Sequence, residues 1–267
     1  MKSFIYVILA FSMLGCGQKS EKIRSFEGFK WVEPQGLQDF NPISFKLSTF
    51  PDQDFMLFFP EWFTSDQFNS VTKFQWDLKP YLAIGSWAGD SYSSTVTIKL
   101  KESEQKVELY WEYEFTNNSD TNLNNLSAFN CVLLNWAPLF KDLAMERTWV
   151  RDASGKEVLL KDIAKTQGVG KRTMQFYPAI GGINLEQYRL NTRWEVTSPE
   201  YLSGDRVKVI SKDGKWLLET IVDGPVAYFF NNWEEDHGCI HAAPLFPPIE
   251  SKSSGSVRGQ IVFTQQN

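Results

Sequence analysis

Strict alternation of apolar and polar residues recurs along this chain and predicts β-strands. Residues 107–115 place Val, Leu, Trp, Tyr and Phe at every second position, with Glu or Tyr between them. Residues 95–100 and 206–209 repeat the pattern with Thr, Lys and Arg as the polar partners. Because successive side chains of a strand point to opposite faces, each segment is expected to form a strand with one buried and one wet face.

Turn signals separate these strands. Asp213-Gly214 lies between two apolar runs and predicts a hairpin, and Ala-Ser-Gly at 153–155 predicts a second one. Residues 257–263 predict a last strand, and the apolar run 55–63 predicts a buried strand that leads into a corner.

Helical signals are short and local, at residues 64–68, 160–167 and 198–204. Strands that alternate with turns at intervals of about ten residues favour a sandwich over βαβ units. The sequence therefore predicts an all-β fold: a single, large, mostly antiparallel β-sandwich over residues 26–267, with a few short helices.

The N-terminus has the layout of a bacterial lipoprotein signal peptide. Lys2 precedes a short apolar run over residues 4–14, and Gly-Cys follows at 15–16. The run is too short for a helix that crosses a membrane, which needs about 20 residues. We predict a signal peptide over residues 1–15, lipid on Cys16 and a short tether over residues 16–25; the alternative is an ordinary secretory signal. The predicted location is the cell envelope, at the outer membrane if the cell is Gram-negative.

Composition and charge limit the partners. The chain carries 27 basic and 32 acidic side chains, a formal net charge of −5. An acidic protein without a basic cluster is a poor partner for nucleic acid or anionic lipid. Nucleic acid is excluded, membrane contact is expected through the lipid alone, and the oligomeric state stays open.

Cys131 and Cys239 remain after Cys16 is assigned to lipid. An even number of cysteines in an oxidising compartment predicts a disulfide between them. In the chain-entropy model a loop of this length is worth about 4–5 kcal/mol.

The segment 233–241, Trp-Glu-Glu-Asp-His-Gly-Cys-Ile-His, carries both histidines of the chain. If it is extended, His237, Cys239 and His241 share one face and could ligate zinc or calcium. Asp236, His237 and His241 could instead act as acid and base in an enzyme. The opposing interpretation is a disulfide at Cys239 and a buried, hydrogen-bonded His241, with no cofactor.

Aromatic residues make up 15% of the chain, including 21 Phe and 10 Trp. Trp136, Trp194 and Trp233 are candidate platforms for sugar rings; the alternative is that they fill the core. Glu108, Glu112 and Glu114, which share a strand face with Tyr110, are interpreted as a solvated sheet face rather than as paired glycosidase carboxylates.

Two resemblances follow from motifs. Residues 107–123, with Trp-Glu-Tyr-Glu-Phe-Thr-Asn-Asn-Ser-Asp at 111–120, resemble the strand and turn of galactose-mutarotase-like supersandwich domains. That resemblance implies a supersandwich-like fold, but mutarotases carry catalytic histidines on separate segments and this chain has no histidine before His237.

The second resemblance is to uncharacterised secreted β-sandwich proteins of planctomycete- and verrucomicrobia-type bacteria. It rests on Asn-Cys at 130–131, Arg-Thr-Trp-Val at 147–150, Cys-x-His-x-x-Pro at 239–244 and Arg-Gly-x-Ile-x-Phe at 258–263. It implies a β-sandwich in a setting concerned with polysaccharide use.

These observations predict a membrane-anchored binding or accessory protein without catalytic activity, with carbohydrate as the favoured ligand. The alternatives are an enzyme that acts on glycans or small molecules through Asp236, His237 and His241, and a structural envelope protein.

Overall fold

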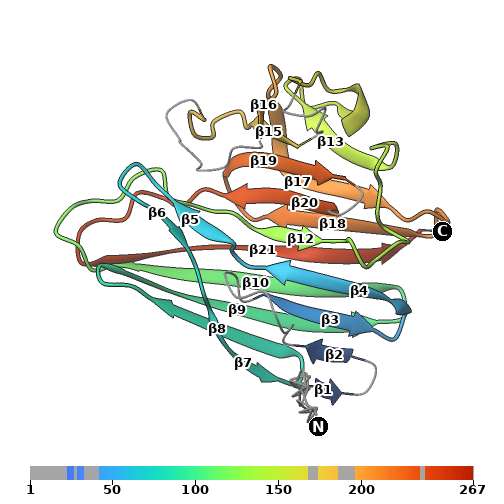
Figure 1. Ribbon diagram of the computed structural model, residues 1–267, viewed down its shortest axis with the longest axis horizontal. Helices are drawn as coiled ribbons and strands as arrows, with labels where there is room; N and C mark the ends of the chain where they lie inside the picture. The colour runs from blue at the N-terminus through green and yellow to red at the C-terminus, as the bar shows by residue number, and fades with distance from the viewer. Residues whose placement is uncertain are drawn as a thin grey trace, which may run out of the picture.

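The structure is a computed structural model that describes residues 23–26, 29–32, 42–167, 174–185, 196–234 and 238–266. Within these ranges the chain forms two nine-stranded sheets, a three-stranded sheet and one short 3₁₀ helix. No helix in these ranges is long and apolar enough to cross a membrane. The predicted all-β, mostly antiparallel fold class is confirmed (Figure 1).

The first sheet has the strand order β1-β2-β3-β4-β12-β20-β19-β15-β16, and its neighbours are antiparallel except for the parallel pair β15 and β16. Its strands are β1 (Ile23–Phe26), β2 (Phe29–Val32), β3 (Ile43–Leu47), β4 (Phe50–Phe58), β12 (Cys131–Leu133), β15 (Gln175–Pro178), β16 (Val196–Thr197), β19 (Val226–Trp233) and β20 (Gly238–Pro244). Strand β1 begins inside the segment that the sequence assigned to the tether.

The second sheet has the order β14-β13-β17-β18-β21-β10-β9-β8-β7 and is antiparallel throughout. Its strands are β7 (Gln75–Lys79), β8 (Leu82–Ala88), β9 (Tyr92–Ser103), β10 (Lys106–Asn117), β13 (Thr148–Asp152), β14 (Glu157–Leu159), β17 (Leu202–Ile210), β18 (Trp216–Val222) and β21 (Ser253–Gln265). The small sheet joins β11 (Ser127–Ala128), β5 (Trp62–Thr64) and β6 (Asn69–Val71), and the 3₁₀ helix η1 spans Leu160–Asp162.

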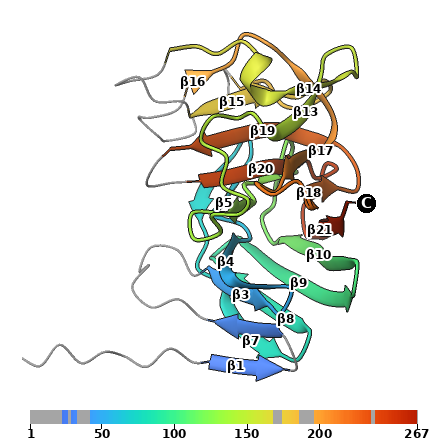
Figure 2. The same cartoon turned by 90° about the vertical axis from the view of Figure 1, so that its right-hand side faces the viewer.

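The two large sheets form two layers (Figure 2). Aromatic residues fill the space between them. Phe55 of β4 meets Phe263 of β21 with ring centroids 4.9 Å apart, and Phe59 meets Trp111 of β10 at 5.8 Å. Each fully buried aromatic side chain stabilises the fold by about 1.5–3 kcal/mol. Most of the buried aromatic residues in the described ranges therefore lie in this core.

The predicted turns are present. Gly214 closes the β17–β18 hairpin with φ +72°, and Gly155 closes the β13–β14 hairpin with φ +86°. Both positions lie in the left-handed region, where glycine carries no steric penalty.

The predicted helices at 64–68 and 198–204 do not form. The hydroxyl of Ser65 does accept hydrogen bonds from the N–H groups of Gln67 and Phe68, as a helix cap would, but the chain then enters β6. The hydroxyl of Ser198 accepts from Glu200 N–H ahead of β17 in the same way. These serines therefore cap isolated turns, because a short polar side chain can bond to a nearby backbone N–H in a turn as well as at the start of a helix.

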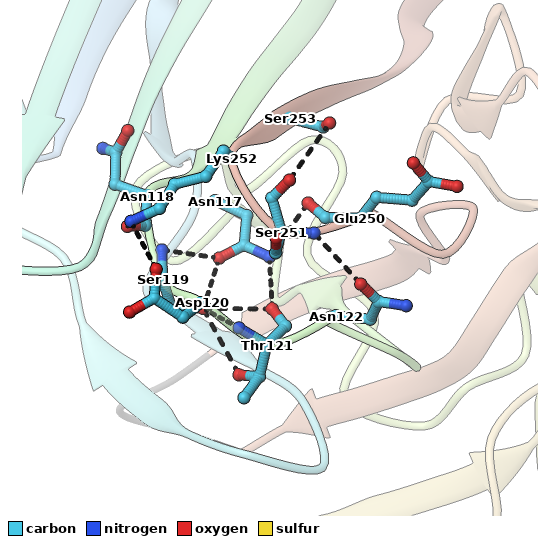
Figure 3. A network of polar contacts seen from close by, with 10 residues as sticks. All are labelled: Asn117, Asn118, Ser119, Asp120, Thr121, Asn122, Glu250, Ser251, Lys252 and Ser253. Carbon is cyan, nitrogen blue, oxygen red and sulfur yellow. Dashed lines mark hydrogen bonds and ion pairs between the residues drawn. The ribbon is translucent and has the colours of Figure 1, made fainter.

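A polar network at the end of β10 joins this strand to the segment before β21 (Figure 3). The buried side chain of Asn117 donates to the carbonyl oxygens of Thr121, Ile249 and Glu250, at 2.8, 3.3 and 3.1 Å. Its Oδ1 accepts from the N–H and the hydroxyl of Ser119, at 3.0 and 2.7 Å. This one amide therefore holds the turn that the sequence matched to supersandwich domains.

Candidate functional site

Neighbouring strands β12 and β20 bring together three residues with metal-ligating side chains. Val132 pairs with Ile240 and Leu133 with Cys239, so the same register places Cys131 opposite His241. Because side chains alternate along a strand, Cys131, Cys239 and His241 lie on one face of the first sheet. The two Sγ atoms and a ring nitrogen of His241 all lie within 4.8 Å of one another.

This cluster lies in apolar surroundings on the face of the first sheet that is turned away from the main core. Phe129 stacks on the His241 ring at a centroid distance of 4.3 Å, and Phe230 meets its edge at 4.9 Å. Met56 and Leu133 pack beside the two cysteines. The site is therefore dry, and any charge inside it is costly.

The carboxyl group of Glu61, next to β5, lies beside the cluster and hydrogen-bonds with Cys131. It lies in the interior, although the residue as a whole is only partly buried, and burial raises its pKa to about 8. A hydrogen bond from the Cys131 thiol works in the opposite direction, with a smaller effect on the pKa. Burial, with smaller contributions from Cys239 and Glu61, raises the pKa of Cys131 well above its usual value.

His241 is the least satisfied polar residue of the cluster. Only 1% of it is exposed, and its one polar contact in the described part of the chain is a weak hydrogen bond with the backbone of Asn130, which leaves the other ring nitrogen without a partner. Burial lowers its pKa to about 3, and the nearby backbone of Asn130 opposes this only weakly. The imidazole is therefore neutral at pH 7, with a ring nitrogen free to bind a ligand.

The site residues predicted from sequence are only partly brought together. Cys239 and His241 do share a face, but Asp236 and His237 lie outside the described residues, as do Cys16 and the signal peptide. Cys131, which the sequence assigned only to a disulfide, takes a place beside the other two ligands. Both thiols are free in this structure, and the disulfide stays a prediction.

The three candidate tryptophans have different surroundings. Trp233 is 2% exposed and belongs to the main core, which corrects its proposed role as a sugar platform. Trp136 is 50% exposed in the loop after β12, and Trp194 lies outside the described residues.

The outer face of the second sheet carries a second candidate site. Three rows of side chains cross β9, β10 and β21, in the registers Thr95–Glu114–Ser256, Thr97–Glu112–Arg258 and Lys99–Tyr110–Gln260. Directly opposed side chains in a sheet have Cβ atoms about 4.5–5.5 Å apart, so these nine residues form a close-set grid. We call them the grid.

Four neighbouring hollows follow this face from β8 to the end of β20. Their volumes are about 520, 330, 310 and 550 Å³. Glu112 lines three of them, Glu114 lines two, and Trp87 borders the first. Carboxylate, hydroxyl, amide and guanidinium groups therefore line a series of hollows in which neighbours share residues.

Tyr110 is held in place within the grid. Its hydroxyl donates to Glu108 Oε1 at 2.9 Å, and the ammonium of Lys106 contacts the same oxygen at 2.6 Å. These hydrogen bonds raise the pKa of Tyr110 and lower the pKa of Glu108. The phenol stays protonated near pH 7, and its ring is 38% exposed in a fixed orientation.

The sequence does not predict this site, because the grid is formed by neighbours on three different strands. The predicted solvated face is correct for Glu112 and Glu114, which are exposed, but wrong for Glu108, which is buried beneath Lys106 and Tyr110, with which it forms hydrogen bonds. The hydroxyl pattern of residues 93–97 and 253–256 was visible, but only the register places it beside Glu112 and Glu114.

Comparisons with known proteins identify the fold. The Slr1438 protein of Synechocystis sp. PCC 6803 matches with a TM-score of 0.50 and 11% identity, over 98% of this chain and 100% of that one. The Escherichia coli K12 protein named "Putative aldose 1-epimerase" matches with a TM-score of 0.50 and 10% identity, over 92% and 99%. A galactose mutarotase related enzyme of Lactobacillus acidophilus follows at 0.45 and 9%, over 93% and 98%.

The chain thus shares its sandwich fold with the Slr1438 protein and with the protein named "Putative aldose 1-epimerase". No family model matches the sequence, and no curated protein does. The predicted resemblance to planctomycete- and verrucomicrobia-type proteins finds no support in these comparisons.

Proposed function

We propose that this protein is a lipid-anchored protein of the cell envelope that binds an oligosaccharide along the grid. The observation that carries the proposal is the row of hollows on the second sheet, lined by hydroxyl, carboxylate and guanidinium groups around the exposed ring of Tyr110. Similarity in fold to a protein named as an aldose 1-epimerase supports carbohydrate as the ligand class.

The chemistry of the grid suits a neutral sugar chain. Glu112 and Glu114 accept hydrogen bonds from sugar hydroxyls, while Arg258 and Lys99 donate to ring and hydroxyl oxygens. The ring of Tyr110 supplies a flat apolar face beside these groups. Because the Glu108 hydrogen bond already fixes this ring, little side-chain entropy is lost when a ligand binds.

Binding without hydrolysis fits the arrangement of the carboxylates. A glycosidase places its two carboxyl groups on either side of the scissile bond. Glu112 and Glu114 instead lie on the same face of one strand, so both reach the ligand from the same side. The buried His241 of the alternative enzyme hypothesis lines none of the four hollows.

The anchor belongs to the same proposal. Acyl chains on Cys16 would hold the sandwich at the membrane surface, and more than one chain is needed for stable attachment. Intact mass of the protein purified from membranes tests this step. Cleavage before Cys16 with added acyl mass is expected, and an unmodified N-terminus at another residue would contradict it.

The binding experiment screens purified protein against an array of neutral oligosaccharides, then compares Tyr110→Ala with Tyr201→Ala. Tyr201 is the matched control because it is an exposed tyrosine outside the four hollows. We expect Y110A to weaken binding about tenfold or more and Y201A to leave it unchanged. Equal affinities, or no binding across the array, would refute the proposal.

A further inference from the structure

We propose that Cys131, Cys239 and His241 form a zinc site between β12 and β20. The proposal is independent of carbohydrate binding, because the cluster and the grid lie on different sheets. Three potential ligand atoms within 4.8 Å of one another, from two segments far apart in sequence, are the observation that carries it.

The distances suit a tetrahedral metal site. Zinc binds thiolate sulfur at about 2.3 Å and imidazole nitrogen at about 2.0–2.1 Å, which separates ligand atoms by roughly 3.3–3.8 Å. Small rotations of the side chains bring atoms within 4.8 Å to that separation. Two sulfur ligands and one nitrogen ligand form the soft donor set that zinc prefers over calcium.

The second observation is that at least one ring nitrogen of the buried His241 has no partner among the described residues, since the Asn130 backbone can serve only one of the two. A buried polar group without a partner costs about 1–3 kcal/mol, so such groups are rare in folded proteins. A disulfide between Cys131 and Cys239 would use both sulfurs and leave this cost in place. A metal ion would satisfy this ring nitrogen and both sulfurs at once, while the other ring nitrogen keeps its hydrogen bond with the Asn130 backbone.

Glu61 lies in hydrogen-bond contact with Cys131 and is the nearest group for the fourth position. The exchange balances as follows: the ion enters, the two thiols and the Glu61 carboxyl each release one proton to solvent, and two metal–sulfur bonds, one metal–nitrogen bond and one metal–oxygen bond form. The two thiolates neutralise the ion and the Glu61 carboxylate leaves a net charge of −1, so burying the site costs far less than burying the free ion. The site is closed by protein groups, as structural zinc sites are.

The site would link distant parts of the chain. Cys131 begins β12, shortly after β11, and Cys239 lies near the start of β20, the strand that returns from β19. A bound ion therefore joins two strands of the first sheet through their side chains, in addition to their backbone hydrogen bonds.

The test uses the full chain, purified without chelator and again after reduction and removal of metal. We expect about one zinc per chain and protection of two thiols from alkylation while zinc is bound. Cobalt(II) added in place of zinc should give thiolate-to-cobalt charge-transfer absorption. A reduced protein that binds no zinc, or a purified protein with a Cys131–Cys239 disulfide and no metal, would overturn the proposal.

Variants identify the ligands. His241→Asn should lower zinc affinity at least a hundredfold, and Glu61→Gln about tenfold. His237→Asn is the matched control, since it removes the other histidine of the chain, and it should leave affinity unchanged. Loss of zinc in H237N but not in H241N would overturn the proposed ligand set. Circular dichroism of each variant shows whether it is folded, and the stoichiometry of the unmodified chain does not depend on any variant.

Discussion

Asn117 provides a quantitative test of how the end of the second sheet is held together. Substitution Asn117→Asp keeps the shape of the side chain and its acceptor oxygen toward Ser119. It replaces the Nδ2 donor with a second oxygen, which then faces the carbonyl groups of Thr121, Ile249 and Glu250. A small chemical change thus converts three attractive contacts into repulsive ones.

The magnitude follows from these contacts. A neutral hydrogen bond contributes about 0.5–1.5 kcal/mol net, and a buried acceptor left without a donor costs about 1–3 kcal/mol. The contact at 3.3 Å is weak, so the two shorter ones dominate the sum. We expect N117D to lower the free energy of unfolding by about 3 kcal/mol, which corresponds to a Tm lower by roughly 6–12 °C.

Urea denaturation at pH 7, followed by tryptophan fluorescence, measures the effect. Asn118→Asp is the matched control because Asn118 is the exposed neighbour and undergoes the same chemical change. It should change the free energy of unfolding by less than about 0.5 kcal/mol. Equal stability of N117D and N118D would refute the view that the Asn117 amide holds this turn.

Three further changes test other parts of the structure. Gly259→Ala would place Cβ 2.1 Å from a backbone oxygen of β18, so we expect it to lower the free energy of unfolding, measured by urea denaturation, by about 3 kcal/mol. The control Ser256→Ala, at an exposed position on the same strand, should lower it by less than about 0.5 kcal/mol. The buried carboxylate of Asp142 accepts hydrogen bonds from two backbone N–H groups and a threonine hydroxyl. Asp142→Ala should therefore lower the free energy of unfolding, measured by calorimetry, by about 3–5 kcal/mol. The exposed control Glu146→Ala should lower it by less than about 1 kcal/mol. Hydrogen bonds from the adjacent Arg206 lower the pKa of Asp205 in the folded protein. Its contribution to the free energy of unfolding is therefore present above the unfolded pKa of about 3.9 and is lost as the pH falls through the lower folded pKa. After allowance for solvent screening, Asp205→Asn should cost less than about 1 kcal/mol at pH 7 and almost nothing near pH 2; a constant deficit across this range would contradict the assignment.

The strands and hairpins were predictable because their signals are local. Alternation over residues 107–115 needs only the two-residue period of a strand, and β10 spans Lys106–Asn117. The hairpin at Asp213-Gly214 was predictable from two residues, because glycine adopts the positive φ that the turn requires. The helix signals at Ser65 and Ser198 were equally local. Their hydroxyls do accept hydrogen bonds from backbone N–H groups, but the chain forms turns there instead of helices.

Both candidate sites depend on pairings that local patterns do not encode. Cys131 meets His241 only because β12 and β20 are neighbours, although more than a hundred residues separate them. Glu112 meets Arg258 only because β21 pairs with β10. A pattern on one strand indicates which face a residue occupies, whereas the register across strands determines its neighbours.

The central claim is that the grid binds an oligosaccharide, and Glu112 at its centre tests that claim most directly. Titration calorimetry with the best ligand from the glycan array compares the unmodified protein, Glu112→Gln and the exposed control Glu104→Gln. A hydrogen bond to a charged group contributes about 1.5–3 kcal/mol, so E112Q should bind about 10- to 100-fold more weakly, and E104Q should bind like the unmodified protein. Unchanged affinity in E112Q would show that the sugar binds elsewhere and would contradict the account.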